Sequence, residues 1–217
     1  MISKRLKKIA SFVSDNSNVL DVGCDHALLD IYLAKNKNAT CVASDINEKP
    51  LQAALKNVKL YDLEDKIKVS LADGVEYITD DIDTVVISGL GSNTIIDIIN
   101  KDFDKLRNVK HFIISSNNDY YYLRKGMNDL GFIINREEMI YDKKYYLIID
   151  FVYGTKKYNY IDLKYGPILR NSNDEVYKDY LINLKNKKIN ILKSLGFRHL
   201  FKKFSIKKEI REIDRIL

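Results

Sequence analysis

Acidic side chains follow three apolar runs in the first half of the chain, each where a buried strand would end. The runs end in Asp21-Val22-Gly23-Cys24-Asp25-His26-Ala27, in Asp45-Ile46 and in Asp73-Gly74. Because ligands of open α/β sheets bind beyond the carboxyl ends of parallel strands, we expect these carboxylates to face one crevice. Each of them alone is equally typical of a turn or a helix cap, so the prediction depends on the ordered set.

The first turn keeps a single glycine, Gly23, of the G-x-G-x-x-G pattern with which dinucleotide sites approach a pyrophosphate. Asp25 stands at the second glycine position, and a carboxylate there would repel a pyrophosphate. A ligand with a cationic centre and no phosphate fits better, and S-adenosylmethionine, with its sulfonium and amino group, is such a ligand. Asp45 would then accept hydrogen bonds from ribose hydroxyls, and Asp73 from the adenine amine.

The cofactor-binding residues that we expect lie in this turn and at the ends of the following strands. They are Asp21, Gly23, Asp25, His26, Asp45, Ile46, Asp73, Gly74 and Gly89. The fourth strand ends in Ile87-Ser88-Gly89-Leu90-Gly91-Ser92-Asn93. Methyltransferases that act on exocyclic amines usually carry Asn/Asp-Pro-Pro-aromatic at this place, so the sequence argues against N6-adenine or N4-cytosine methylation.

Apolar runs alternate with amphipathic segments through the first 130 residues, which predicts a mostly parallel sheet covered by helices on both faces. The expected strands are 18–23, 41–45, 67–71, 84–88 and 111–115, and the expected helices are 3–14, 28–35, 47–61, 94–100 and 120–130. After Gly131 the alternation stops, and Phe132–Ile140 and Tyr145–Tyr153 are typical of a strand pair added at a sheet edge. Residues 1–154 therefore read as one doubly wound α/β domain.

The remaining residues, 155–217, follow a different pattern. Gly166-Pro167 interrupts the chain, and then Glu175–Leu195 and Arg198–Leu217 show helical spacing with Gly196 between them as a helix stop. We expect a C-terminal α-helical hairpin that resembles a coiled coil.

The net charge of +6 belongs to this second part. Residues 1–154 hold 20 Lys and Arg against 23 Asp and Glu, whereas residues 155–217 hold 16 against 7. AT-rich coding also enriches lysine, but it would not remove acids from one stretch, and none stands between Asp179 and Glu209. A basic attachment on a near-neutral body indicates a nucleic-acid partner. The RNA contacts that we expect are Lys4, Arg5, Lys185, Lys188, Arg198, Lys202 and Lys203.

Composition excludes several other classes. No run approaches the roughly 18 apolar residues of a transmembrane helix, and the charged start lacks a signal-peptide core. With only Cys24 and Cys41, the chain has neither a disulfide framework nor a four-cysteine zinc site. We expect a cytoplasmic protein that binds no metal and acts as a monomer.

Four segments, taken together and in order, resemble the TrmK family of bacterial tRNA methyltransferases. They are Ser3–Val13, Asp21–Leu29, Ile87–Gly91 and Tyr165–Pro167. The resemblance implies a Rossmann-like class I methyltransferase domain with a C-terminal helical hairpin. It also implies S-adenosylmethionine as cofactor, tRNA as partner and methylation of N1 of adenine at position 22. The most specific element is Asp25-His26-Ala27, because most class I methyltransferases have glycine where Asp25 stands.

Two departures from the family pattern stand beside the expected site. The family commonly has Gly-Met-Gly-Gly where this chain has Gly89-Leu90-Gly91-Ser92, and Gln-Pro-Asn where it has Ser115-Ser116-Asn117. They leave a second hypothesis open, a non-catalytic RNA-binding protein on a methyltransferase fold. A third hypothesis keeps the enzyme but gives it a small-molecule or protein acceptor, with the tail as a dimerisation element.

The reaction implied by the resemblance does not require a strong catalytic base. N1 of adenine is already nucleophilic, so the reaction needs in-line positioning more than a strong base. We expect Asp25 to stabilise the positive charge that develops on the ring or to accept an N6 proton. Asn117 would pair with an adenine edge or cap the next helix. His26 would bond cofactor, base or only local groups, and Tyr120–Tyr122 would stack the target base or lie at the surface.

Overall fold

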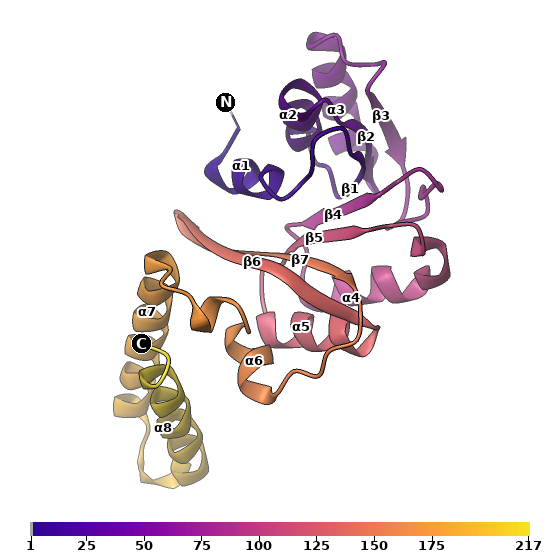
Figure 1. Cartoon of the computed structure of the whole chain (residues 1–217). Coiled ribbons are helices and arrows are strands. Elements are labelled where there is room, and N and C mark those ends of the chain that lie inside the picture. Colours follow the sequence, from indigo (N-terminus) through magenta and orange to yellow (C-terminus); the bar gives the residue numbers. More distant parts are fainter. Residues whose placement is uncertain (1) are drawn as a thin grey trace.

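A twisted seven-stranded sheet forms the centre of the molecule (Figure 1). The computed structural model describes residues 2–217. The strands are β1 (Asn18–Val22), β2 (Thr40–Asp45), β3 (Ile67–Leu71), β4 (Thr84–Ser88), β5 (His111–Ser115), β6 (Phe132–Asp142) and β7 (Lys144–Tyr153). Their order is β3-β2-β1-β4-β5-β7-β6. β1 to β5 run parallel, whereas β7 pairs antiparallel with both β5 and β6. The predicted doubly wound, Rossmann-like sheet is confirmed, and the order reverses between β1 and β4.

Helices cover both faces of this sheet, as the continuous apolar strands require. The helices before the hairpin are α1 (Lys4–Ala10), α2 (Leu28–Lys37), α3 (Glu48–Leu60), α4 (Ser92–Lys101) and α5 (Tyr120–Asp129), with a 3₁₀ turn η1 (Phe103–Leu106). Neighbouring residues of β1 show the division, since Val19 packs into the core under α1 to α3 and Leu20 into the core under α4 and α5. Both side chains are fully buried.

α1 is shorter than expected, and the starts of α1 and α3 are capped differently. Ser3 does cap α1, accepting a hydrogen bond from the Leu6 amide at 3.2 Å, but the helix ends at Ala10 rather than near residue 14. Asn47 stands at the N-cap of α3 without capping it by its side chain, because its Nδ2 donates to Asp45 Oδ1 instead.

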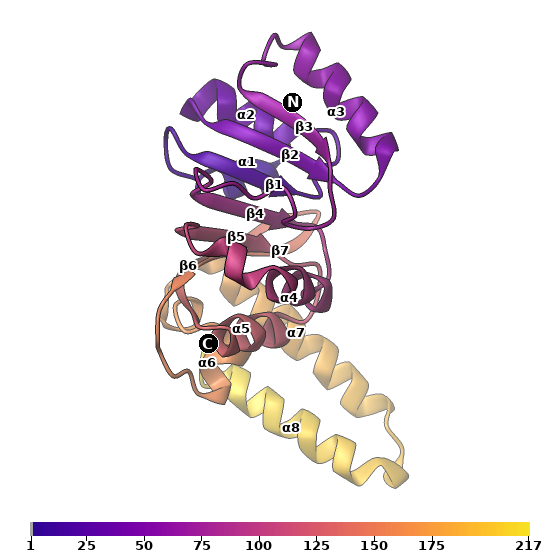
Figure 2. The same cartoon turned by 90° about the vertical axis from the view of Figure 1, so that its right-hand side faces the viewer.

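The C-terminal part is helical, as predicted. It consists of α6 (Tyr160–Tyr165), α7 (Glu175–Ser194) and α8 (Leu200–Asp214), with the 3₁₀ turns η2 (Leu169–Asn171) and η3 (Phe197–His199). α7 and α8 pair as a hairpin whose tip projects away from the sheet (Figure 2). The sequence pattern did not predict α6, a helix of six residues with an Asn159 capping box.

The base of this hairpin is continuous with the core of the sheet. Tyr177 and Leu181 of α7 and Ile213 of α8 are buried in the same apolar cluster as Phe112 and Phe132. The domain boundary at residue 154 stays a prediction, and these core contacts cross it. No helix within residues 2–217 is long and apolar enough to cross a membrane.

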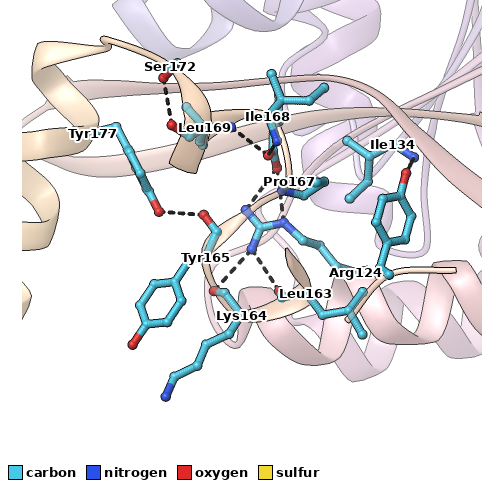
Figure 3. Close-up of polar contacts among 12 residues, drawn as sticks. Arg124, Ile134, Leu163, Lys164, Tyr165, Pro167, Ile168, Leu169, Ser172 and Tyr177 are labelled. Atoms are coloured by element: carbon cyan, nitrogen blue, oxygen red, sulfur yellow. Dashed lines mark hydrogen bonds and ion pairs between the residues drawn. The ribbon is translucent and has the colours of Figure 1, made fainter. Parts of the chain in front are cut away.

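A buried ion pair fastens the segment that leads into the hairpin (Figure 3). Arg124 of α5 contacts Glu137 of β6 through Nε and Nη2, both at 3.1 Å from Oε2, and the two side chains are 2% and 0% exposed. Glu137 Oε1 accepts hydrogen bonds from the amides of Ile168 and Leu169 at 2.7 and 3.0 Å. Arg124 Nη1 donates to the Leu163 carbonyl at 3.1 Å. The residues that lead into the hairpin are therefore held by a buried ion pair whose charges are satisfied.

Candidate functional site

A cavity of about 280 Å³ lies beyond the carboxyl ends of β1, β2 and β4. Its lining consists of Arg5, Leu6, Asp21, Gly23, Cys24, Asp25, His26, Leu28, Leu29, Asp45, Ser88, Gly89 and Leu90. Six of the nine expected cofactor residues are among them, namely Asp21, Gly23, Asp25, His26, Asp45 and Gly89. The structure thus brings together the turn after β1, the end of β2 and the end of β4, at the reversal point where open sheets bind ligands.

The turn after β1 has an unusual backbone. Gly23, Asp25 and Ala27 have φ angles of +77°, +53° and +56°, which fall in the left-handed region. The amides of Gly23 and Cys24 donate to the Ser44 carbonyl at 2.8 and 2.9 Å, so the turn is tied to β2. Left-handed conformations in residues other than glycine cost energy and persist mainly where a site requires them. The turn presents Asp25 and His26 outward while Ala27 stays buried at the start of α2.

Asp25 and His26 form a solvent-exposed pair at the cavity. The side chains are 74% and 50% exposed, with 3.4 Å between Asp25 Oδ1 and His26 Nε2. With this exposure, the Asp25 carboxylate is accessible to an incoming base. The arrangement suits the charge-stabilising role expected for Asp25, whereas His26 has a local partner as well as a place in the lining.

Beneath this turn lies a buried pair of carboxyl groups, Asp21 and Asp30. They are 3% and 0% exposed. Burial raises the pKa of Asp30 to about 7, and burial together with the neighbouring Asp30 raises the pKa of Asp21 well above its usual range. Burial also raises the pKa of the Cys24 and Cys41 thiols, which marks them as inert packing groups.

Asp30 was not expected at the site, although its spacing gave a signal. It stands three residues after Ala27 and three before Leu33, and all three side chains are fully buried. An acidic residue at a position of the buried helical face indicates a buried carboxyl. Only the fold, however, places that carboxyl against Asp21.

Arg5, which we expected among the RNA contacts, lies at the cavity, and its RNA-binding role stays a prediction. It is half-buried in the wall of the cavity, where its guanidinium lies 5.2 Å from the centroid of the Tyr146 ring. A Cβ added at Gly89 would lie 3.8 Å from Arg5 Nη1. Its positive charge lowers the pKa of Asp21, against the effect of burial. α1 thus supplies a cation to a cavity whose lining includes three carboxyl groups.

Three expected cofactor residues, Ile46, Asp73 and Gly74, lie outside this lining. Asp73 Oδ2 instead forms an exposed ion pair with Lys101 Nζ at 2.7 Å. Its strand end remains adjacent to that of β2, because the Ala72 amide donates to the Asp45 carbonyl at 3.1 Å. Asp45 Oδ1 accepts from the Asn47 amide at 2.9 Å, which fixes the orientation of its carboxylate at the cavity.

Asn117 connects the cavity to a second one. Its side-chain Nδ2 donates to the Gly89 carbonyl, and its backbone N–H donates to the Leu90 carbonyl at 2.9 Å. The second cavity, of about 360 Å³, lies between the start of α5 and the base of the hairpin. Its lining consists of Asn117, Asn118, Asp119, Tyr120, Tyr121, Arg124, Met139, Lys164, Tyr165, Tyr177, Tyr180, Leu184, Lys188 and Glu209. Of the three tyrosines considered for stacking, Tyr120 and Tyr121 line it and Tyr122 does not.

Ser92 and Ser116, at which the chain departs from the family pattern, contact each other. Ser92 and Ser116 are 1% and 2% exposed, and their hydroxyl oxygens are 2.9 Å apart. Both hydroxyls also donate to the Asn118 carbonyl, at 2.6 and 2.9 Å. The Ser92 amide donates to Asn118 Oδ1 at 3.0 Å. The loops after β4 and β5 are therefore held together by side-chain hydrogen bonds.

The expected RNA contacts on the hairpin fall into two groups. Lys185 and Lys188 form ion pairs with Asp214 and Glu209 of α8, so their charges are engaged within the hairpin. Arg198 and Lys202 are exposed near the tip and Lys203 is half-buried there, while Lys4 is exposed on α1. Across residues 2–217, no group of three or more His, Cys, Asp and Glu side chains is placed to hold a metal ion.

Comparison with known proteins gives consistent matches. Residues 2–149 match the family model described as "Methyltransferase domain". The structure of Streptococcus pneumoniae Sp1610, a putative tRNA (m1A22) methyltransferase, has a TM-score of 0.96 and 32% identity, covering 100% of both chains. The same protein is also known in complex with S-adenosyl-L-methionine. M. capricolum TrmK, bound to S-adenosyl-homocysteine, has a TM-score of 0.87 and 32% identity over 99% of this chain and 97% of that one.

A curated sequence relative points the same way. The tRNA (adenine(22)-N(1))-methyltransferase of Bacillus subtilis is 28% identical over 153 residues, which is 70% of this chain. The matched segment spans 59% of that protein's length.

Proposed function

This chain belongs to the TrmK family of methyltransferases, and we propose that it transfers the methyl group of S-adenosylmethionine to N1 of adenine 22 in tRNA. The observation that carries the proposal is the cavity beyond β1, β2 and β4, which combines Asp21, Asp25 and Asp45 with Arg5. Relatives that match over the whole chain are named for this activity and are known with the cofactor or its product.

The donor set of the cavity fits the cofactor. Asp45, held by the Asn47 amide, would accept hydrogen bonds from the ribose hydroxyls. Arg5 would pair with the carboxylate of the amino-acid end, and Asp21 would receive the amino group. A pyrophosphate would meet three carboxylates here, so a dinucleotide fits poorly. The cofactor, when bound, supplies a methyl group activated by a sulfonium.

The chain's own residues then position the acceptor and manage its charge. Asp25, 74% exposed at the mouth of the cavity, would stabilise the adenine ring as it becomes positive or accept a proton from N6. Asn117 is fixed by its hydrogen bonds to Gly89 and Leu90, and its amide oxygen is the kind of acceptor that an adenine amine requires. Orientation accounts for most of the rate gain in such a mechanism.

We further propose that the protein acts as a monomer. A tRNA substrate places the reaction in the cytoplasm. The exposed basic residues Lys4, Arg198 and Lys202 would contact phosphates, while Lys185 and Lys188 would first have to leave their ion pairs.

Label transfer from S-adenosylmethionine tests the proposal against the two alternatives. We expect label in unmodified tRNA with the wild-type protein and a large loss of turnover in Asp25→Ala, with cofactor affinity changed much less. Asp45→Ala serves as the matched control, because it should weaken cofactor binding first. Label that enters only a small molecule or a protein would contradict the proposal. So would an Asp25→Ala variant with unchanged turnover.

A further inference from the structure

The tip of the hairpin exposes large apolar side chains among basic ones. Leu200, Phe201 and Phe204 at the start of α8 are 69%, 95% and 67% exposed. Arg198, Lys202 and Lys207 surround them, and all three are exposed as well. Exposed aromatic rings among cations have two common partners in solution, an apolar protein surface or the bases of a nucleic acid.

The packing of α8 shows that these rings are not needed for the hairpin itself. Ile206 and Ile213 form the inward face of the helix and are 6% and 0% exposed. Phe201, Phe204 and Lys208 follow at spacings of three and four and share another face. The helix is thus apolar on two sides near its start, and only one of them is covered.

The uncovered face leads back toward the catalytic edge of the sheet. Lys208 Nζ lies 5.8 Å from the centroid of the Tyr160 ring at the start of α6. Tyr160 in turn contacts Tyr121, with ring centroids 5.5 Å apart. Tyr121 lines the same cavity as Asn117, which is hydrogen-bonded to Gly89 of the cofactor cavity. Aromatic and basic side chains therefore follow one another from the tip to the site.

Charge decides between the two kinds of partner. No acidic residue occurs between Asp179 and Glu209. The acids at the base are paired, Glu209 with Lys188 at 2.6 Å and Glu212 with Lys164 at 2.9 Å, so they offset little of the charge at the tip. A second copy of this chain would bring like charge to the same surface. A polyanion would instead bring opposite charge to this surface.

We propose that the tip residues Phe201 and Phe204, with Arg198, Lys202 and Lys207, form a platform that stacks unpaired bases of the tRNA. From this platform, a series of side chains leads to the second cavity, where Asn117 lies. The series consists of Lys208, Tyr160 and Tyr121. This inference rests on the proposed function and extends it from phosphate contacts to base contacts. The rings supply stacking, which tolerates any base, and the cations hold the backbone.

Salt dependence separates the two contributions. Binding of unmodified tRNA without cofactor is measured from low to high salt for Phe201→Leu, Phe204→Leu and Lys202→Gln. Each leucine variant should weaken binding about 5- to 100-fold with an unchanged salt slope, since a stacked base contributes that much without releasing counterions. Lys202→Gln should reduce the slope by roughly 0.9. Leu60→Ala, a residue 71% exposed on α3, is the matched control and should change nothing.

A single-stranded 12-nucleotide RNA and a duplex of equal length identify what is stacked. The leucine variants should lose affinity for the single strand and keep their affinity for the duplex. Unchanged tRNA affinity in both variants, in a wild-type protein that does methylate tRNA, overturns the platform and leaves the proposed function standing. Loss of self-association in the variants with unchanged tRNA affinity would assign the surface to a second copy and overturn the proposal as well.

Discussion

Arg124 and Glu137 form a salt bridge that is almost fully buried, and its further hydrogen bonds go to α6 and to the residues between α6 and the hairpin (Figure 3). The pair joins α5, which begins at the second cavity, to β6 at the sheet edge. α5 and the sheet edge are thus both tied to the residues that lead into the hairpin. The hairpin is held at a defined angle rather than tethered by a flexible linker.

Removing one partner of this pair should be costly. Glu137→Ala leaves a buried guanidinium without its counter-charge and two amides without their acceptor, so we expect the free energy of unfolding to fall by about 3–5 kcal/mol. Glu137→Gln keeps an acceptor for the amides and should cost less. Urea unfolding measures both, with Glu138→Ala as the control. Glu138 pairs with Lys8 and Arg136 at the surface, and its loss should cost about 1 kcal/mol or less.

Gly166 should not tolerate a side chain. Its φ is +90°, and an added Cβ would lie 2.5 Å from Glu137 Oε1 and 2.8 Å from Arg124 Nη2. Gly166→Ala therefore combines backbone strain of about 1–3 kcal/mol with displacement of the buried pair. Gly196→Ala is the matched control, because nothing lies within 4 Å of its added Cβ. Thermal or urea unfolding that ranks the two variants equally would contradict this assignment.

The buried Asp30 should make stability depend on pH. Its pKa is raised to about 7 in the folded chain, so the folded state binds more protons than the unfolded state between about pH 4 and pH 7. Stability is then fully present below that window and falls as pH rises through it. Asp30→Asn should flatten this dependence and raise stability at pH 8 relative to wild type. A steeper fall in the variant would show that Asp30 is ionised in the native protein.

Ser92 and Ser116 should be energetically coupled. Both serines belong to one hydrogen-bond network. Ser92→Ala or Ser116→Ala therefore leaves buried polar groups unpaired, and each should lower the free energy of unfolding by about 1–3 kcal/mol. The double variant should cost less than the sum of the two. A double-mutant cycle by urea unfolding measures the difference. Strict additivity would mean that the two loops are fixed independently.

The sheet was predictable because each parallel strand is a short apolar run bounded by turn residues, as in β1 before Gly23. The gathering of Asp21, Asp25 and Asp45 followed from the rule that strand ends share one edge. The place of Arg5 in the cavity was not predictable, since only the packing of α1 over the cavity distinguishes Arg5 from the other basic residues of its helix. Spacing along the chain contains no signal for that packing.

The tail shows the same limit. Its helices and its charge were visible in the sequence, but its attachment was not, because Arg124 and Glu137 lie in segments that look like ordinary surface helix and edge strand. Their burial also changes how the tail should be studied. Truncation near residue 154 would expose this ion pair and part of the core, so substitutions at the tip are the cleaner probe of tRNA binding.

Nucleoside analysis of reacted tRNA tests the central claim most directly. Unmodified tRNA is incubated with the protein and S-adenosylmethionine, digested, and its methylated nucleosides are identified by mass spectrometry. A second tRNA carries guanine in place of adenine at position 22. We predict 1-methyladenosine in the first tRNA and none in the second. Absence of 1-methyladenosine from both, or equal amounts in the two, would contradict the claim.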